Sequence, residues 1–224
     1  AGQIVVMTYP QIGNYGINPE DVESRKLFLS GLIVKEASRT ASNWRMRQTL
    51  QEYLKSNGIP GLEGLDTRAL VRQLRTHGAM RGMIGSSAVP VEELLERVTR
   101  HPSMAGCDLA SGVTQNEQYG WAESAEVGCP VILPSTHRPH RNTATGGRLK
   151  VAVYDYGAKW NILRSLSEVG CDVTVVPAST TATDILNMKV DGVMLSNGPG
   201  DPDPLRYAVG NIEKLIGRVP IFGI

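Results

Sequence analysis

The segment DGVMLSNGPGDP, residues 191–202, joins an apolar strand to a turn that contains two glycines and two prolines. Asn-Gly and Pro-Gly pairs are common turn formers, because glycine accepts a positive φ and proline presets φ. One interpretation is therefore a simple turn. Glycine at the end of a buried strand also lets the backbone approach a ligand, and its N–H donors can point outward, as an oxyanion hole requires. Both interpretations stay open at this point.

The segments around this turn alternate strands with helices. The apolar patterns predict strands in LKVAVYDYG, CDVTVVPA, DGVMLS and VPIFGI, and helices in NILRSLSEVG, TATDILNMK and PLRYAVGNIEKLIGR. Such alternation predicts a parallel sheet with right-handed crossovers and helices on both faces. Ligands bind outside the carboxyl ends of such strands, which are expected here at residues 156–157, 197–198 and 223–224. The glycine turn therefore lies on the expected ligand-binding edge.

The domain boundaries follow from composition. Residues 134–148, PSTHRPHRNTATGGR, lack any apolar period and read as a linker between a first domain, residues 1–133, and a second, residues 149–224. The first domain is less regular and is expected to be α+β, with a strand in LFLSGLIVKEAS and three helices. The expected helix boundaries are Ser42 or Asn43 and Gly58 for the first, Asp66 or Thr67 and Gly78 for the second, and a stop before Pro102 for the third.

The overall composition excludes several classes of protein. A chain of 224 residues with 41% apolar residues can bury a sizeable core, and a net charge of +1 argues against a general binder of nucleic acid or acidic membranes. The sequence has neither an apolar run of about 20 residues nor a signal-peptide pattern. Its three cysteines lack the spacing of a zinc site or a disulfide framework, so a reducing, cytosolic compartment is expected.

The motifs then point to a family. LSNGPGDP, followed by a helix and VPIFGI, resembles the class I glutamine amidotransferase domain, a flavodoxin-like parallel sheet. GQIVVMTYPQIGNYGIN, GLDTRALVRQLRTHGAMRG and YDYGAKWNILR narrow the resemblance to the small, glutamine-hydrolysing subunit of carbamoyl phosphate synthetase. The resemblance covers nearly the whole chain and implies an α/β protein, in which an α+β domain precedes the first half of an amidotransferase domain.

The resemblance also implies roles for residues of the turn. Gly198 and Gly200 match glycines that contact bound glutamine, and the N–H of Gly198 would donate a hydrogen bond to the oxyanion. Gly223 and Ile224 match the first two residues of a nucleophile elbow, so the nucleophilic cysteine is expected just after Ile224. The triad histidine and glutamate are expected beyond it, and a glutamine-contacting serine before Ala1. We therefore expect a fragment cut at both ends, without hydrolytic activity of its own and partly disordered near its carboxyl end.

Several other residues have an ordinary structural interpretation beside a functional one. Asp155 is either a functional carboxylate at the end of its strand or a cap of the following turn. A basic stripe on the second helix either docks an acidic patch of a partner or is a solvated face. Trp160 stands where a basic or smaller polar residue is expected, and no function is drawn from it. The stripe residues are Arg68, Arg72 and Arg75, and the residues expected to lack catalytic or metal-binding roles are Cys107, Cys129, Cys171, His77, His101, His137 and His140.

The resemblance implies partners and leaves two rival functions open. The expected partners are L-glutamine and a large synthetase subunit, which forms a heterodimer with this subunit in the cytoplasm, or in an organelle of a eukaryote. That subunit would use ATP, a divalent metal, bicarbonate and the released ammonia to make carbamoyl phosphate for arginine and pyrimidine biosynthesis. This chain itself is expected to hold no cofactor or metal. The rivals are a catalytically inert docking scaffold and another class I amidotransferase, serving anthranilate or guanylate synthesis.

Overall fold

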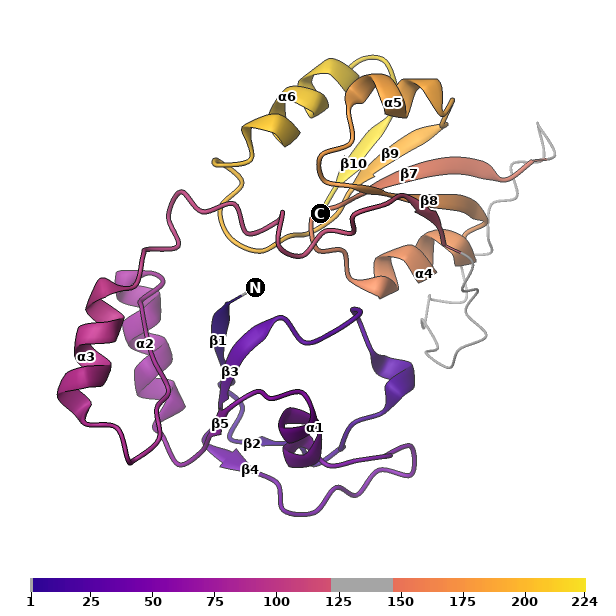
Figure 1. The fold of residues 1–224 in the computed structure, drawn as a ribbon. Coiled ribbons are helices and arrows are strands. Elements are labelled where there is room, and N and C mark those ends of the chain that lie inside the picture. Colours follow the sequence, from indigo (N-terminus) through magenta and orange to yellow (C-terminus); the bar gives the residue numbers. More distant parts are fainter. Residues whose placement is uncertain (1, 122–146) are drawn as a thin grey trace. The chain divides into compact units, whose positions relative to one another are not determined.

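The computed structural model describes residues 2–121 and 147–224. Within these ranges the chain forms two compact units, each built on a sheet of mainly parallel strands (Figure 1). No helix in the described ranges is both long and apolar enough to cross a membrane. The units consist of Ala1–Pro19 with Lys26–Met104, and of Glu20–Arg25 with Ala105–Ile224.

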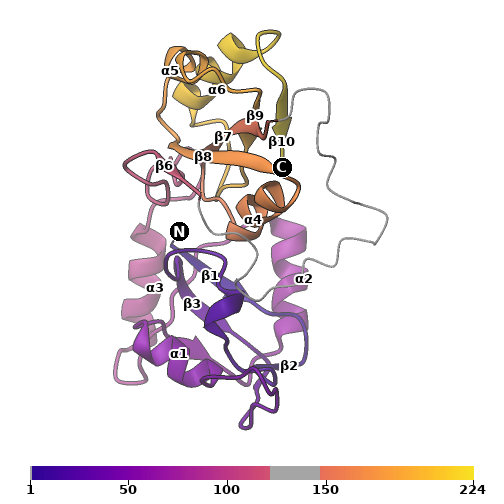
Figure 2. The same ribbon diagram turned by 90° about the vertical axis from the view of Figure 1, so that its right-hand side faces the viewer.

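The boundary of the first unit differs from the expected domain end at residue 133. Residues from Ala105 onward belong to the second unit. The physical reason is strand pairing, because β6 (Tyr119–Gly120) pairs antiparallel with β8 (Cys171–Pro177) (Figure 2). Residues 134–146 of the expected linker lie outside the described residues.

The second unit confirms the predicted parallel sheet. Its strand order is β10-β9-β7-β8-β6, in which all pairs except β6–β8 are parallel. Counted from β7, the parallel strands follow the order 2-1-3-4, which is the flavodoxin-like arrangement. The remaining elements of this unit are β7 (Leu149–Asp155), α4 (Trp160–Glu168), α5 (Ala182–Asn187), β9 (Gly192–Leu195), α6 (Arg206–Leu215) and β10 (Ile221–Gly223).

Two apolar clusters cover the two faces of this sheet. On one face α5 and α6 pack over Tyr154 and Val176, and on the other α4 packs its buried Leu163 against Val153 and Val175 (Figure 1). Neighbouring residues of β7 enter opposite clusters, because side chains of a strand alternate between its faces. Helices on both faces explain why these strands read as nearly continuous apolar runs.

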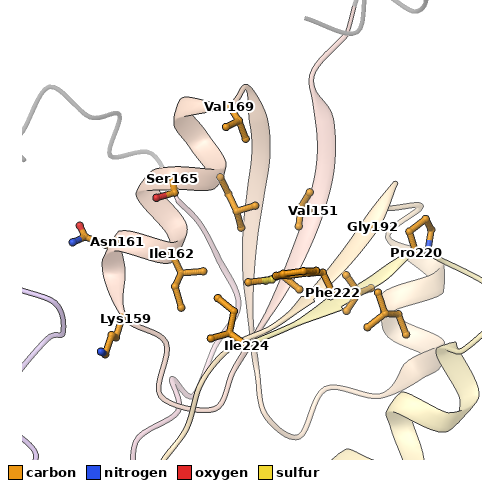
Figure 3. A pocket seen from close by; sticks show the side chains of 14 residues that line it. Val151, Lys159, Asn161, Ile162, Ser165, Val169, Gly192, Pro220, Phe222 and Ile224 are labelled. Atoms are coloured by element: carbon orange, nitrogen blue, oxygen red, sulfur yellow. The ribbon is translucent and has the colours of Figure 1, made fainter. Parts of the chain in front are cut away.

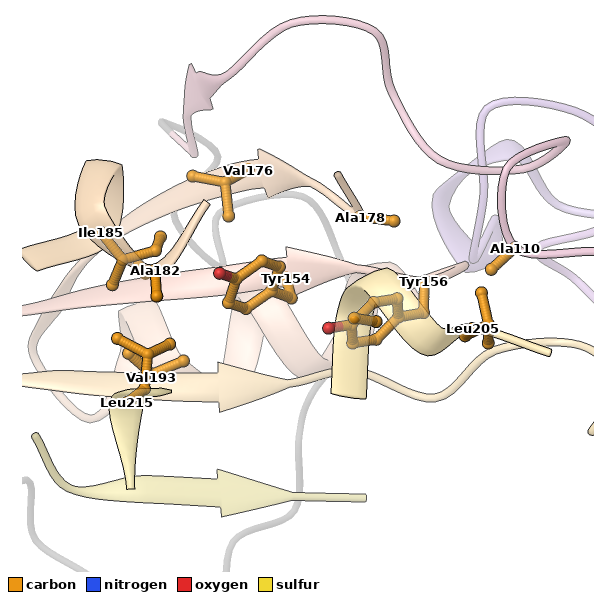
Figure 4. Packing of buried hydrophobic residues seen from close by; sticks show 12 residues of the cluster. Ala110, Tyr154, Tyr156, Val176, Ala178, Ala182, Ile185, Val193, Leu205 and Leu215 are labelled. Carbon is orange, nitrogen blue, oxygen red and sulfur yellow. The ribbon is translucent and has the colours of Figure 1, made fainter. Parts of the chain in front are cut away.

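The core under α5 and α6 contains a pair of tyrosines (Figure 4). The rings of Tyr154, on β7, and Tyr156, just after its end, are stacked with centroids 5.7 Å apart. The hydroxyl of Tyr154 donates a hydrogen bond to the carbonyl oxygen of Thr180 at 3.0 Å. The hydroxyl of Tyr156 is buried and has no hydrogen-bond partner among the described residues. Burial is the main reason why the pKa of Tyr154 rises to about 12 and that of Tyr156 rises further.

A segment distant in the sequence caps the start of α4. The main-chain oxygen of Glu23 accepts the N–H of Trp160 at 3.0 Å, and its carboxylate accepts the N–H of Asn161 at 3.0 Å. The first N–H groups of a helix have no partner within the helix, so Glu23 satisfies two of them, and its carboxylate complements the helix dipole. This contact explains why Glu20–Arg25 belongs to the second unit.

The first unit confirms the expected α+β character. Its main sheet has the parallel order β1-β3-β5, and β2 pairs with β4 in a second small sheet. The expected strand in LFLSGLIVKEAS is therefore two strands, β3 and β4. The elements of this unit are β1 (Gln3–Val6), β2 (Gln11–Ile12), β3 (Leu29–Ile33), β4 (Glu36–Ala37), α1 (Leu50–Ser56), β5 (Gly61–Leu62), α2 (Thr67–His77) and α3 (Val91–Arg100), and a 3-10 turn, Pro19–Asp21, reaches into the second unit.

One helix start was predicted wrongly. The first helix begins at Leu50 and not after Ser42 or Asn43, because Thr49 forms a capping box with Glu52. The other predicted boundaries are confirmed. Asp66 caps α2 by accepting the N–H of Ala69, Gly78 follows its last residue, and α3 ends before Pro102.

Candidate functional site

The glycine turn lies at the carboxyl edge of the second sheet, as predicted. Leu195 of β9 is paired with Tyr154 of β7 on one side and with Gly223 of β10 on the other. Parallel strands in this register end side by side, so the loops that follow β7 and β9 lie at the same edge as the end of β10. The turn that contains Gly198 and Gly200 therefore lies where ligands bind in sheets of this type.

The structure shows a separate physical reason why each of the two positions in the turn requires glycine. A Cβ atom on Gly198 would lie 2.6 Å from the carbonyl oxygen of Tyr156, so a side chain there would force the two loops apart. Gly200 has a φ of +79°, which side chains rarely tolerate. A Cβ atom there would also lie 3.1 Å from Leu109. The close backbone approach that glycine permits at position 198 is thus an approach to the backbone of Tyr156, within the protein itself.

Two glycines of the turn have N–H donors without an acceptor among the described residues. Gly198 and Gly200 are both exposed, and neither donates its N–H to an acceptor within residues 2–121 and 147–224. Exposed N–H donors at the end of a buried strand can stabilise negative charge on an oxygen atom. Glutamine binding by these two glycines stays a prediction.

The structure places Asp155 beneath this edge as a loop cap. Asp155 is 6% exposed, and its carboxylate accepts the N–H groups of Gly157 at 3.0 Å and Ala158 at 2.9 Å. Its other oxygen accepts the N–H of Gln115 at 2.9 Å. These contacts support the capping interpretation of Asp155, because the carboxylate is occupied by three backbone donors.

A segment that sequence reasoning missed borders the same edge. Leu109 lies against Gly200, and Val113 would meet a Cβ atom on Gly157 at 3.1 Å. The hydroxyl of Thr114 accepts the N–H of Ala178 at 3.0 Å. The segment DLASGVTQ has no helix or strand period, so no sequence signal placed it beside the glycine turn.

An apolar groove of about 650 Å³ lies elsewhere on this unit, on the α4 face of the sheet (Figure 3). Ile162 and Leu166 of α4 and Phe222 of β10 line it, and Phe222 is 67% exposed. Neither glycine of the turn lines this groove, and few polar groups converge on it. The groove is therefore a feature separate from the glycine turn.

Four of the remaining cysteine and histidine candidates lie within the described ranges. Cys171 begins β8 at the amino end of the sheet, and burial raises the pKa of its thiol. Cys107 is half-buried, and His77 and His101 lie at the ends of α2 and α3, where each ring contacts a main-chain oxygen. In the described part of the chain, no three potential metal-ligating side chains converge. The basic residues Arg68, Arg72 and Arg75 lie exposed on α2, whereas Cys129, His137 and His140 lie outside the described residues.

Comparison with protein families agrees with this architecture. Residues 152–224 match the family model of class I glutamine amidotransferases, so the second unit contains part of a domain of that class. Residues 1–84 match the model of the carbamoyl-phosphate synthase small chain, CPSase domain. Because curated relatives of the same name match all or nearly all of its length, the chain belongs to the carbamoyl phosphate synthase small-chain family.

Three relatives illustrate the extent of the match. The carbamoyl phosphate synthase small chain of Syntrophotalea carbinolica is 53% identical over 223 residues, which are 100% of this chain and 57% of the relative. The small chain of Xanthomonas axonopodis pv. citri is 44% identical over 100% of this chain and 60% of its own length. The chloroplastic small chain of Oryza sativa subsp. japonica is 42% identical over 100% of this chain and 48% of its own length. The chain thus spans about half the length of these relatives.

Proposed function

We propose that the intact protein is the glutamine-hydrolysing subunit of carbamoyl phosphate synthase. The observation that carries this proposal is the glycine turn, which exposes two unused amide donors at the carboxyl edge of an amidotransferase-type sheet. In the proposed site Gly198 and Gly200 contact the bound glutamine, and the N–H of Gly198 stabilises the oxyanion. The nucleophilic cysteine is proposed to follow Ile224.

The proposed reaction is an acyl transfer to sulfur. A thiolate attacks the side-chain amide carbon of glutamine, a C–S bond forms, and the carbonyl oxygen takes the negative charge. The N–H of Gly198 stabilises that charge, and one such donor contributes on the order of 3 kcal/mol. A histidine oriented by an acidic residue gives a proton to the amide nitrogen, the C–N bond breaks, and ammonia leaves. Water then hydrolyses the thioester to glutamate.

The proposed partner is the large synthetase subunit. It would receive the ammonia and, with bicarbonate, ATP and a divalent metal, form carbamoyl phosphate for arginine and pyrimidine biosynthesis. The exposed stripe of Arg68, Arg72 and Arg75 is proposed to contact an acidic patch of this partner. Reversal of these three charges should weaken association, whereas reversal of Arg97 and Arg100, which pair with carboxylates on α3, should not. Equal effects of both reversals would contradict the docking role.

A cytoplasmic location is proposed, in line with the reducing compartment that the cysteine pattern suggests. An organelle form is an alternative for a eukaryotic source, since the matching small chains of Oryza sativa and Arabidopsis thaliana are named chloroplastic. Fractionation of the source cells, followed by detection of the protein, decides between these locations.

Glutamate release by the intact subunit tests the activity. We expect steady glutamine hydrolysis by the subunit with its partner, and loss of hydrolysis when the residue after Ile224 is replaced by alanine. The isolated 224-residue chain should show none above background. A folded intact subunit that binds its partner without releasing glutamate would favour the inert scaffold, and recovery of an anthranilate or guanylate synthetase as partner would favour the other rival.

A further inference from the structure

The side chain of Asn197 joins the glycine turn to the loop that follows β7. Its Nδ2 group donates to the carbonyl oxygen of Gly157 at 3.2 Å, and its Oδ1 atom accepts the N–H of Lys159 at 3.3 Å. The amide has one correct orientation here, because only Nδ2 can donate to a carbonyl and only Oδ1 can accept an N–H. Asn197 therefore bridges two backbone groups of one loop from the residue next to Gly198.

The buried hydroxyl of Ser196 fixes the main chain of Asn197. Ser196 is 5% exposed, and its Oγ atom accepts the N–H of Tyr156 at 3.0 Å. The hydroxyl donates to the carbonyl oxygen of Asn197 at 2.8 Å. Asn197 is thus held by both its side chain and its main chain. We call Ser196 and Asn197 together the turn clamp.

Peptide geometry links the turn clamp to the candidate oxyanion donor. The carbonyl of Asn197 and the N–H of Gly198 belong to one planar peptide group and, in the trans form, point in opposite directions. The structure has no cis peptide bonds among its described residues. A hydrogen bond that fixes this carbonyl toward Ser196 therefore also fixes the N–H of Gly198 away from it. That N–H has no acceptor in the described part of the protein.

We propose that Ser196 and Asn197 are positioning residues that hold the Asn197–Gly198 peptide plane and so aim the Gly198 N–H at the substrate oxygen. This inference rests on the proposed function for its chemical consequence, whereas the orientation itself can be measured without activity. Neither residue touches the reacting atoms. Preorganised donors stabilise charge effectively because they need no reorientation during the reaction.

The chain offers a matched control in Asn211 of α6. Its side chain also bridges two backbone groups, since Oδ1 accepts the N–H of Ala182 at 3.2 Å and Nδ2 donates to the carbonyl oxygen of Thr180 at 3.1 Å. Asn211→Ala removes the same number and type of hydrogen bonds as Asn197→Ala. It leaves the peptide between Asn197 and Gly198 untouched.

The first measurement is an NMR spectrum of the 224-residue chain and of the intact subunit, labelled with ¹³C at asparagine carbonyls and ¹⁵N at glycine. Within residues 1–224 only two peptides carry both labels, Asn57–Gly58 and Asn197–Gly198. The first lies at the end of α1 in the other unit and serves as an internal reference. We expect Ser196→Ala to shift or broaden the Gly198 signal and leave the Gly58 signal unchanged. Asn197→Ala removes the labelled carbonyl before Gly198, so this variant is followed by kinetics and not by this spectrum. Asn211→Ala should leave both unchanged.

The second measurement is glutaminase kinetics of the same variants in the intact subunit with its partner. A misdirected N–H donor reduces the stabilisation of the transition state more than it reduces substrate binding. The kcat value should therefore fall by about 10- to 100-fold in both turn-clamp variants, with a KM change below about threefold. Asn211→Ala should keep kcat within about twofold of wild type.

The outcomes separate the two proposals. An unchanged Gly198 signal in Ser196→Ala overturns the positioning role, and so does a kcat loss in both turn-clamp variants that is no larger than that of Asn211→Ala. An intact wild-type subunit without glutamate release overturns the proposed function instead. In that case the NMR comparison still decides whether the turn clamp orients the Gly198 N–H.

Discussion

The carboxylate of Asp155 accepts the N–H of Gln115 at 2.9 Å, although the two residues are 40 positions apart in the sequence. Asp155 ends the central strand β7, and Gln115 belongs to the irregular segment that borders the glycine turn. Because the same carboxylate also accepts the N–H groups of Gly157 and Ala158, one buried side chain joins two loops of the candidate site. A charged acceptor of several backbone donors is a strong hydrogen-bonding arrangement.

Replacement of Asp155 by asparagine should destabilise the protein. An amide has only one oxygen, so its NH₂ group would face at least one backbone N–H that loses its acceptor. A buried donor without a partner costs about 1–3 kcal/mol, and the free energy of unfolding in urea should fall by that amount. Asp172→Asn, on the exposed surface of β8, should change it by less than about 0.5 kcal/mol. Equal unfolding curves for both variants would show that the Asp155 contacts contribute little.

Alanine at Gly198 should disturb the site more than alanine at another glycine. The new methyl group would lie 2.6 Å from the Tyr156 carbonyl oxygen, and backbone on both sides leaves no easy relief. We expect a stability loss of about 1–3 kcal/mol and a kcat loss of at least about tenfold in the intact subunit.

The control for this change is Gly210→Ala. Gly210 lies inside α6, and a Cβ atom there would meet nothing within 4 Å. Alanine at that position should stabilise the helix by about 0.5–1 kcal/mol. Glutaminase activity should be unchanged. A Gly198→Ala variant with normal kcat would contradict the role of this peptide in the reaction.

The sequence predicted the second sheet well, because its apolar runs and helix periods recur over short connections. The parallel pairing and the position of the glycine turn at the carboxyl edge both follow from those patterns, whereas the flavodoxin-like arrangement was implied by the family resemblance. The first helix was misplaced at its start for a local reason. Ser42 and Asn43 are good capping residues by type, but only Thr49 has a glutamate three residues later that completes a capping box.

The site was predicted only in part. Sequence patterns located Gly198 and Gly200 but not the contacts that surround them. Leu109 and Gln115 come from a segment without periodicity, and their approach to the turn depends on how β6 returns to the sheet. The close approach of Gly198 to Tyr156 likewise depends on strand register, which a single sequence does not specify at atomic distance.

Phenylalanine at Tyr156 should stabilise the protein. The buried hydroxyl of Tyr156 has no partner in the described ranges, so its removal should raise the free energy of unfolding by about 1 kcal/mol. The control Tyr154→Phe should lower it by about 1 kcal/mol, because that hydroxyl bonds to Thr180. The opposite order of the two variants in a urea titration would contradict this assignment.

The same tyrosines predict a loss of stability at alkaline pH. Burial raises the pKa of Tyr154 from its ordinary 10 to about 12 and raises that of Tyr156 further. Above pH 10 the unfolded chain releases these protons while the folded chain retains them. The free energy of unfolding should therefore be unaffected below that pH and fall as the pH rises toward about 12. In Tyr156→Phe this fall should be shallower, and an equally steep fall in the variant would exclude Tyr156 as a cause.

Alanine at Thr49 should weaken the start of α1, and alanine at Ser42 should not. The Thr49 hydroxyl accepts the N–H of Glu52 at 3.2 Å, and the Glu52 carboxylate accepts the Thr49 N–H at 2.8 Å. Loss of such a cap costs about 1 kcal/mol. Hydrogen exchange of Leu50–Ser56 should accelerate about fivefold in Thr49→Ala and stay at the wild-type rate in Ser42→Ala. Because the hydrogen bonds from Thr49 lower the pKa of Glu52, the cap should also weaken as the pH falls through the carboxyl range. Faster exchange in Ser42→Ala than in Thr49→Ala would contradict the assignment of Thr49 as the cap.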